Sequence, residues 1–213
     1  MFDSVLPSNK EHTIILASAS PRRKHLLREI GMKFRVDPSS VDESGIPYSS
    51  MREFAIKAAF AKAEEVANRS ENALVIGADT IVCLGDQILG KPHVPEEARR
   101  MLSDLKGRSH SVITGVAVME SGAGNSALDA EETRVFFKDY SQKEMEEYIA
   151  TGEPLDKAGG YGIQGSGGDL VKKIEGDYFN VVGLPLELLF NLMSGFTEVD
   201  CYLEKLKQLD RPF

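Results

Sequence analysis

The chain has 213 residues, of which 42% are hydrophobic and 27% charged, and its formal net charge is −8. This composition is typical of a soluble globular protein, and the negative charge disfavours a nucleic acid polymer as a partner, because proteins that bind one usually carry a broad basic surface. The two cysteines lack metal-ligand spacing, and no run approaches the roughly 18 apolar residues of a membrane helix, so we expect a cytoplasmic protein with no membrane partner.

Residues 1–12 are polar and lack periodicity, so we expect a flexible N-terminal arm. Residues 13–17 form a short, β-branched apolar run, which predicts a buried strand. Ser20 is suited to be an N-cap and Pro21 to the first helical position, which predicts a helix from there to Gly31. A strand, a serine-rich turn and a helix in this order direct backbone N–H groups and the positive end of a helix dipole at one place.

Two arginines, Arg22 and Arg23, lie in the first turn of this predicted helix. Cations are disfavoured there because the dipole end is already positive, so their presence indicates a bound anion, to which Ser18 and Ser20 would add hydroxyl donors. The alternative is a solvated basic helix start, and these residues alone give the two interpretations equal weight. Neither of the two commonest phosphate-binding loop motifs is present.

The next segment holds two acidic residues. After a candidate strand over residues 34–36, residues 37–48 are predicted to form a loop, because they are rich in proline, glycine and serine. This loop contains Asp42 and Glu43, which on their own are better explained as solvated loop acids than as ligands.

A long helix follows the loop. Ser50 and Glu53 have the spacing of a capping box, and the helix is predicted to reach about Ala67 with an alanine-rich face that can pack closely against a sheet. Lys57 and Lys62 lie on this helix, and solvent exposure is the favoured interpretation for Lys57.

A continuous apolar run over residues 73–78 predicts a fully buried strand, which continues over 81–84 and turns back at 88–89. Asp79 follows the buried run, at the kind of position where open α/β sheets bind ligands, although a turn-capping role has equal weight. Lys91 precedes a proline, which stiffens its backbone and favours a fixed cation, though a surface lysine is the commoner outcome.

The remaining elements are predicted from apolar periodicity and from start and stop signals. They are a helix from Pro95 to Gly107, a strand over 112–119, a mobile hairpin loop over 121–132, a return strand over 134–137, a helix capped by Ser141 and Glu144, a helix from Pro185 and a last helix over 199–206. Residues 151–183 are rich in glycine and predict a long functional loop. Alternating strands and helices indicate an α/β fold around a central sheet.

Three groups of residues could take part in chemistry. They are an anion site of serines and arginines, further lysines, and carboxylates that can hold a divalent metal. This combination suits phosphoryl chemistry on a small molecule, in which catalysis is mostly positioning and charge neutralisation. The four histidines share no metal-ligand spacing, and we interpret them as structural or surface residues. No G-x-S-x-G motif supports acyl transfer.

Several segments, taken together and in order, resemble the Maf family of nucleotide pyrophosphatases. They are 16–23 (LASASPRR), 77–80 (GADT), 90–92 (GKP), 107–110 (GRSH), 148–154 (YIATGEP), 157–165 (KAGGYGIQG) and 180–185 (NVVGLP). The resemblance implies a two-lobed α/β fold of the Maf/ITPase-like kind, with a central mixed sheet flanked by helices, a cleft between the lobes and one domain over residues 13–213. It also implies a homodimer, and a chain that forms one domain of a longer polypeptide.

The resemblance implies hydrolysis of a nucleoside triphosphate to the monophosphate and pyrophosphate, with Mg²⁺ or Mn²⁺ as the divalent metal cation. Asp79 is similar to the general base that activates water and is also a candidate metal ligand. Glu43 is similar to the metal-binding acid, with Asp42 as the less favoured choice. The other matching positions are substrate-contacting ones: Ser18, Arg22 and Arg23 around the triphosphate, Lys62 and Lys91 facing phosphate, and Arg22, Thr80 and Gln164 in the subgroup that prefers dTTP and UTP. CTP and modified pyrimidine nucleotides remain open as substrates.

Two alternatives to an enzyme are a nucleotide-sensing module with little turnover and a structural accessory domain. Asp79 and Lys91 favour the enzyme, because a sensor does not need a placed base. The two arginines at the helix start disfavour the accessory domain, because without a ligand they would only destabilise the helix.

Overall fold

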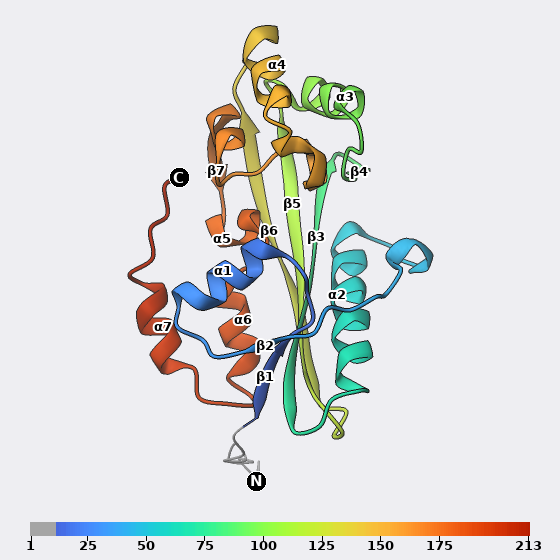
Figure 1. Cartoon of the computed structure of the whole chain (residues 1–213), viewed down its shortest axis with the longest axis vertical. Coiled ribbons are helices and arrows are strands. Elements are labelled where there is room, and N and C mark those ends of the chain that lie inside the picture. The colour runs from blue at the N-terminus through green and yellow to red at the C-terminus, as the bar shows by residue number, and fades with distance from the viewer. Residues whose placement is uncertain (1–11) are drawn as a thin grey trace.

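Three long strands form the centre of the molecule and run along most of its length (Figure 1). They are β3 (Ala73–Leu84), β5 (Ser109–Glu120) and β6 (Ser126–Phe137), and each pairs with the next in antiparallel register. The computed structural model describes residues 12–213, so the arm predicted over residues 1–12 lies, apart from His12, outside the described residues.

Shorter strands complete a seven-stranded mixed sheet with the order β2-β1-β3-β5-β6-β7. β1 (Thr13–Leu16) pairs in parallel with β3 and with β2 (Arg35–Val36), and β7 (Val171–Glu175) pairs antiparallel with β6. β4 (Gln87–Leu89) folds back onto the end of β3. This arrangement confirms the predicted α/β class with a central mixed sheet.

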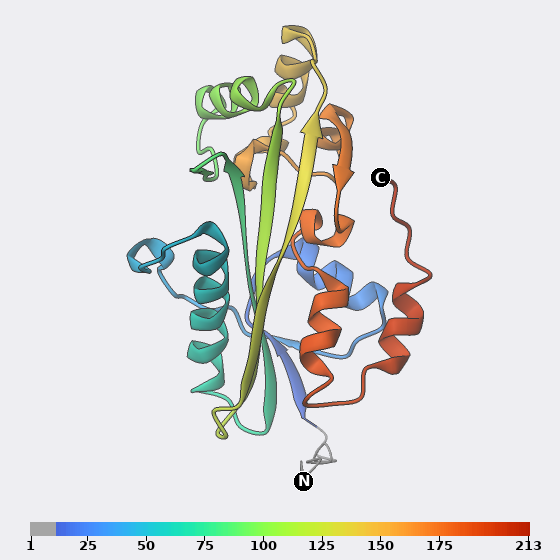
Figure 2. The same cartoon turned by 180° about the vertical axis from the view of Figure 1, so that it is seen from behind.

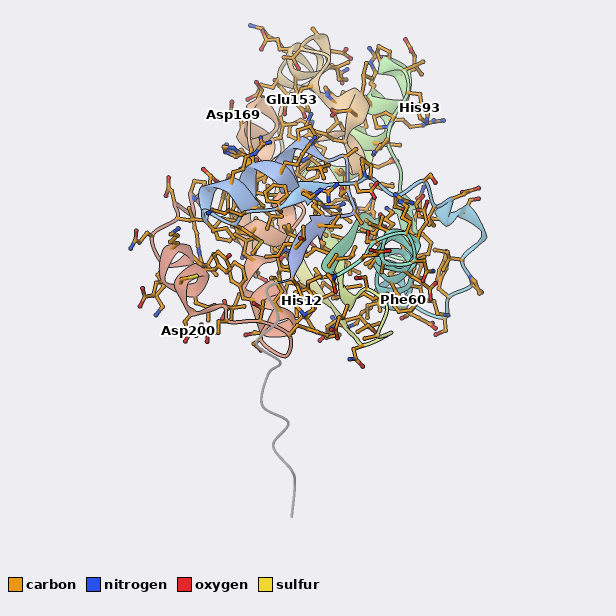
Figure 3. All side chains as sticks on the ribbon, turned by 60° about the horizontal axis from the view of Figure 1, so that its bottom comes forward. His12, Phe60, His93, Glu153, Asp169 and Asp200 are labelled. Carbon is orange, nitrogen blue, oxygen red and sulfur yellow. The ribbon has the colours of Figure 1, made fainter. Side chains whose placement is uncertain are left out.

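Helices cover both faces of this sheet at its basal end, which we call the basal lobe (Figures 1 and 2). α2 (Met51–Ala67) packs on one face through its alanines, and α1 (Pro21–Glu29) and α6 (Leu186–Met193) share the other face. α7 (Asp200–Leu206) packs against α6. Seen from the basal end, Phe60 on α2 and Asp200 at the start of α7 lie on opposite sides of the sheet (Figure 3).

The alternation of side chains along β3 explains this layering. Leu74 and Ile76 join the core beneath α1 and α6, whereas Ala73 and Val75 join the core beneath α2, because successive side chains of a strand point to opposite faces. Both faces are buried, which is why the strand appears in the sequence as a continuous apolar run.

The opposite end of the sheet carries the second group of elements, which we call the distal lobe. It contains β4, β7, α3 (Pro95–Leu105) and α4 (Gln142–Ala150), and α3 packs against α4. Three short 3-10 turns complete the distal lobe: η2 (Glu153–Asp156), η3 (Ala158–Gly160) and η4 (Ser166–Leu170). A fourth, η1 (Glu43–Gly45), belongs to the loop before α2. The two-lobed arrangement confirms the predicted architecture.

Two predicted loops contain regular structure instead. β6 begins at Ser126, within the loop predicted over 121–132, because pairing along the whole of β5 holds polar residues of low strand propensity in the ladder. The stretch 151–183 contains β7 and the helix α5 (Tyr178–Val182), which are ordered by contacts with β6 and β5 that local composition does not show.

The helix starts follow the predicted caps with one difference. The box of Ser141 and Glu144 is complete. At α2 the Ser50 side chain accepts the N–H of Glu53, but the Glu53 carboxylate accepts from Ser49, because Ser49 offers both its N–H and its hydroxyl. Within residues 12–213, every helix is too short or too polar to cross a bilayer.

Candidate active site

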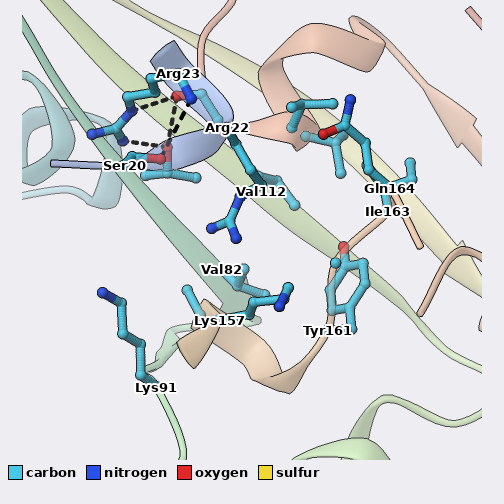
Figure 4. Close-up of a pocket in the computed structure, with 16 residues that line it drawn as sticks. Ser20, Arg22, Arg23, Val82, Lys91, Val112, Lys157, Tyr161, Ile163 and Gln164 are labelled. Carbon is cyan, nitrogen blue, oxygen red and sulfur yellow. Dashed lines mark hydrogen bonds between the residues drawn. The ribbon is translucent and has the colours of Figure 1, made fainter. Parts of the chain in front are cut away.

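Two adjoining pockets occupy the cleft between the lobes. The outer pocket is lined by residues of the β1–α1 turn, the loop before α2, α2 itself, β3, β4 and the β4–α3 connection. Its polar members include Ser18, Glu43, Lys62, Asp79 and Lys91. The inner pocket lies beside it and adds apolar walls; its members include Arg22, Thr80, Val82, Val112, Lys157, Tyr161, Val182 and Gln164 (Figure 4). Every substrate-contacting or catalytic residue predicted from the sequence therefore lines one of the two pockets.

The β1–α1 turn forms one wall of both pockets. Ser20 caps α1, and its hydroxyl accepts the backbone N–H of Arg23 at 3.5 Å, as the sequence predicted. Ser18 Oγ accepts the N–H of Ser20 at 3.2 Å, so the turn is closed by its own side chains. The N-terminal end of α1, with its positive dipole end, therefore faces the outer pocket.

The two arginines of this turn point in different directions. Arg23 is buried, and its guanidinium makes four hydrogen bonds within the fold: Nε to the Gly183 carbonyl (2.8 Å), Nη1 to the Ala78 carbonyl (2.8 Å) and Ser18 Oγ (3.0 Å), and Nη2 to Thr80 Oγ1 (3.0 Å). Burial lowers the pKa of Arg23, against the opposing charge of Asp79. Arg23 therefore joins the turn to β3 and to the segment after α5, and most of its donors are already used.

Arg22 projects into the cleft (Figure 4). Its side chain lines both pockets, and among the described residues no hydrogen bond to it is formed. Its free guanidinium can therefore bind an anion in a bidentate manner.

A lysine joins the two candidate acids of the outer pocket. Lys62 Nζ lies 2.7 Å from Asp79 Oδ1 and 2.5 Å from Glu43 Oε1, although these residues come from α2, β3 and η1. Burial alone would raise the pKa of Glu43, but the hydrogen bond and charge of Lys62 outweigh it and hold the pKa below its usual value.

Asp42 lies apart from this pair. Its side chain accepts the N–H of Ser44 at 3.0 Å and caps η1, and it does not line either pocket. Of the two loop acids, the structure thus brings Glu43 to the site.

Two further lysines approach from the distal lobe. Lys91 is exposed at the junction of the two pockets. Lys157 donates to the Glu153 carbonyl at 2.8 Å and to Asp156 Oδ1 at 2.7 Å, and its side chain lines the inner pocket. Lys157 was not among the site residues predicted from the sequence; its position within the glycine-rich stretch, and at the start of the family-like segment 157–165, could have indicated it.

The inner end of the cleft is held by side-chain hydrogen bonds. Thr80 Oγ1 lies 2.9 Å from Thr114 Oγ1, and Tyr161 Oη lies 2.7 Å from His110 Nε2. Burial lowers the pKa of His110 to about 4, so this imidazole is neutral at neutral pH, consistent with a structural role. Tyr161, which was also not among the predicted site residues, lines the pocket with Gln164.

The donor set limits the metal chemistry of the site. Among residues 12–213 no three histidine, cysteine or acidic side chains gather in a way that could enclose a metal ion. Glu43 and Asp79 converge on one ammonium group, so the pair already balances a positive charge. Two carboxylates of this kind fit Mg²⁺, which in proteins is commonly held by one or two carboxylates together with substrate phosphates and water.

Comparisons with known proteins agree on one family. A family model described as Maf-like protein matches residues 13–196. The dTTP/UTP pyrophosphatase of Dictyoglomus thermophilum is 50% identical over 182 residues, which cover 85% of this chain and 94% of that protein. The dTTP/UTP pyrophosphatase of Moorella thermoacetica is 49% identical over 183 residues, which cover 86% and 94% respectively.

One solved structure gives a weaker likeness. A HAM1 protein from Coxiella burnetii superposes with a TM-score of 0.43 and 20% identity, over 62% of this chain and 75% of that chain.

Proposed function

Because this chain belongs to the Maf family, we propose that it hydrolyses dTTP and UTP to the monophosphate and pyrophosphate. The observation that carries this proposal is the composition of the outer pocket. It brings the carboxylates of Asp79 and Glu43 together with the start of α1 and with the cationic side chains of Arg22 and Lys91. The names of relatives that are about 50% identical over most of the chain support the same substrates. CTP and modified pyrimidine nucleotides are further candidates, because a single methyl group changes selectivity by only about 1–3 kcal/mol.

We assign the triphosphate to the outer pocket and its junction with the inner one. Arg22 and Lys91 would neutralise phosphate oxygens, and the hydroxyls and backbone N–H groups of the β1–α1 turn would donate to them. Arg23 would act mainly by holding Ser18 and Thr80 in place, because its donors are occupied within the fold.

We propose that Asp79 acts as the general base. Its carboxylate takes a proton from water, the water oxygen attacks phosphorus, and the anhydride bond between the α- and β-phosphates breaks, so that pyrophosphate leaves. Lys62, which contacts Asp79, would hold this carboxylate in place and then face the phosphate.

Glu43 and Asp79 would hold a divalent cation, Mg²⁺ or Mn²⁺. The bound cation would neutralise charge that develops on the phosphates. Lys62 lies between the same two carboxylates, and this arrangement supports the proposal that they can share a cation.

The inner pocket would hold the nucleobase. Its apolar walls suit a flat ring, and the Gln164 amide can both donate to and accept from a pyrimidine edge. Thr80 and Arg22 border the same pocket and would complete the selection.

Product analysis tests the proposal. The purified chain is incubated with dTTP, UTP, CTP, ATP, GTP and modified pyrimidine triphosphates in Mg²⁺ or Mn²⁺, with and without EDTA. We expect monophosphate and pyrophosphate from dTTP and UTP, and loss of turnover with EDTA. Release of single phosphates would contradict the reaction. Tight binding of these nucleotides without turnover would instead identify a nucleotide-sensing module.

We also propose that residues 13–213 act as one domain, as a cytoplasmic homodimer, without nucleic acid or membrane partners. The comparisons support this only through family membership. Sedimentation equilibrium of the purified chain, with and without dTTP, tests the dimer, and a single monomeric species in both conditions would contradict it.

A further inference from the structure

Residues 209–213, the C-terminal segment, lie outside the stretch matched by the family model. The segment leaves α7 and runs back along the molecule toward the level of β7 (Figures 1 and 2). It has no regular secondary structure, and most of its side chains are exposed, with Leu209 half-buried. Its position is therefore set by a few contacts with the body of the protein.

Leu209 packs against the main core cluster, and two aromatic contacts join the segment to the first two residues of α5. The ring of Phe213 stacks on Tyr178 with 6.3 Å between centroids and 23° between planes. The guanidinium carbon of Arg211 lies 5.2 Å from the centroid of the Phe179 ring, within the range of a cation–π interaction. Tyr178 is only 7% exposed and Phe179 only 3%. The C-terminal segment thus lies over aromatic rings that are buried in the structure.

Gln164 lies between this segment and the cleft. It lines the inner pocket, and it also lines a second cavity, the rear cavity, whose other walls include Leu26, Glu29, Tyr178, Leu209, Asp210 and Pro212. Burial raises the pKa of Tyr178, and the Gln164 side chain beside its hydroxyl opposes that rise. The side chain proposed to contact the nucleobase is therefore bordered on its other side by Tyr178 and the C-terminal segment.

We propose that the C-terminal segment is a positioning element for nucleobase recognition: it fixes Tyr178, and Tyr178 orients the amide of Gln164 in the inner pocket. This inference rests on the proposed function. It assigns a role in the same site to residues that do not line the cleft.

The expected effect follows from where the contacts lie. The proposed reacting groups Asp79 and Lys62 are in the outer pocket, while Gln164 lines the inner one. Loss of the segment's contacts would let the Gln164 amide rotate, which weakens binding of the base and leaves the phosphate chemistry in place. The inference therefore predicts a change in KM at nearly constant kcat.

Two variants test it with dTTP as the substrate. Tyr178→Phe keeps the ring and its stacking partner but removes the hydroxyl, and Phe213→Ala removes the stacking at an exposed position. We expect each to raise the KM for dTTP about fivefold, because the Gln164 amide is then less well oriented, with kcat within about twofold of the original. Unchanged KM values in both variants would overturn the inference.

A double-mutant cycle separates positioning from general loosening. In a Gln164→Ala background, Tyr178→Phe should have no further effect on KM, because the two side chains act through one contact. Equal effects in both backgrounds would contradict the inference. Tyr202→Ala is the matched control, because Tyr202 also stacks on an aromatic, Phe190, but lines neither pocket of the cleft. It should lower thermal stability without changing KM.

A binding measurement keeps this inference separate from the proposed function. If the unaltered chain did not hydrolyse dTTP, the proposed function would be contradicted. Calorimetric titration would still measure the affinity for dTTP, to which the inner pocket contributes. A weaker affinity in Tyr178→Phe and Phe213→Ala would then support the positioning role, and an unchanged affinity would contradict it.

Discussion

At the residue scale, the central feature is a lysine shared by two carboxylates. Lys62 contacts Asp79 and Glu43, so removal of Lys62 would leave two carboxylates without their shared cation, whereas removal of either carboxylate would leave an ion pair. Lys62 Nζ lies 2.7 Å from Asp79 Oδ1, so this contact fixes the direction of the Asp79 side chain. The proposed base therefore has a fixed orientation within the fold.

Asp79→Asn tests the general base. Asparagine keeps the size and an oxygen that can accept from Lys62, but it cannot take a proton from water. We expect kcat for dTTP to fall about 1,000-fold, with dTTP affinity nearly unchanged. Steady-state kinetics and calorimetry measure the two quantities. Asp42→Asn, in the same loop as Glu43 but outside both pockets, should retain full activity; a near-normal rate in Asp79→Asn would disprove the assignment.

Alanine substitutions of the two neighbouring arginines, Arg22 and Arg23, should have different effects on stability. Arg23→Ala would leave the buried Ala78 carbonyl without its Arg23 donor and the Gly183 carbonyl with only the 3.4 Å contact from Thr80, and we expect the free energy of unfolding to fall by about 3 kcal/mol. Arg22→Ala should change that free energy by less than about 0.5 kcal/mol, because its guanidinium makes no such bonds, yet it should raise KM for dTTP. Urea unfolding and kinetics compare the pair, and equal stability losses would contradict the assignment.

The burial of His110 predicts that the stability of the protein depends on pH. Its pKa falls from 6.5 to about 4 on burial, so between these values the unfolded chain binds a proton that the folded chain does not. Stability therefore rises with pH in this window, and acidification from pH 6.5 to 4 should remove about 3 kcal/mol. Urea unfolding of His110→Gln should show a flatter profile. His25→Gln, at an exposed position, should behave like the unaltered chain.

At the element scale, the close approach of α2 to the sheet places Lys62. A Cβ atom on Gly77 would lie 2.2 Å from the Ala59 carbonyl oxygen, and one on Gly115 would lie 2.0 Å from that of Ala55. Glycine is required at both positions because α2 backbone occupies the space. Gly115 is paired with Asp79 across the ladder, so the same contact brings the helix to the strand that carries the proposed base.

Gly115→Ala should therefore affect both stability and activity. The added methyl group must push α2 away from the sheet, since the obstructing atoms are backbone, and we expect a loss of about 3 kcal/mol in the free energy of unfolding. The contact between Lys62 and Asp79 should lengthen, and kcat should fall. Gly195→Ala is the control, because a Cβ there meets no atom within 4 Å and the backbone is not left-handed. Equal stability of the two variants would contradict this packing argument.

At the scale of the whole molecule, the site is built from both lobes. The β1–α1 turn and α2 belong to the basal lobe, whereas Lys91 and Lys157 belong to the distal lobe, and the long central strands connect the two. A nucleotide in the cleft would contact residues of both lobes. Its phosphates would neutralise positive charges that the two lobes bring to the cleft, Arg22 from one lobe and Lys91 and Lys157 from the other.

Nucleotide binding should therefore stabilise the chain as a whole. A non-hydrolysable dTTP analogue with Mg²⁺, at about 100 times its Kd, should add about 2.7 kcal/mol to the free energy of unfolding. For a chain of this size, that corresponds to a rise in Tm of about 5 °C or more. Differential scanning calorimetry measures the shift, and EDTA should reduce it. An equal shift with the corresponding ATP analogue would contradict pyrimidine selection by the inner pocket.

Much of the basal lobe follows from local sequence. The strand, the Ser20 cap and the Pro21 start of α1 were predicted because they depend on hydrogen bonds and backbone preferences within a few residues. The buried run of β3 was predicted for a similar reason, since burial on both faces leaves a continuous apolar pattern. Short local motifs, taken in order along the chain, were also sufficient to indicate the family.

The tertiary structure alone decided how these residues meet. Arg22 and Arg23 are adjacent and chemically identical, yet Arg22 lines the cleft while Arg23 donates a hydrogen bond to Gly183, 160 residues away. Lys62 could be placed on a helix from sequence, but not between two carboxylates from other segments. The physical reason is that burial, charge partners and side-chain direction depend on which distant segments pack together, whereas caps and periodicity are fixed within one turn or strand.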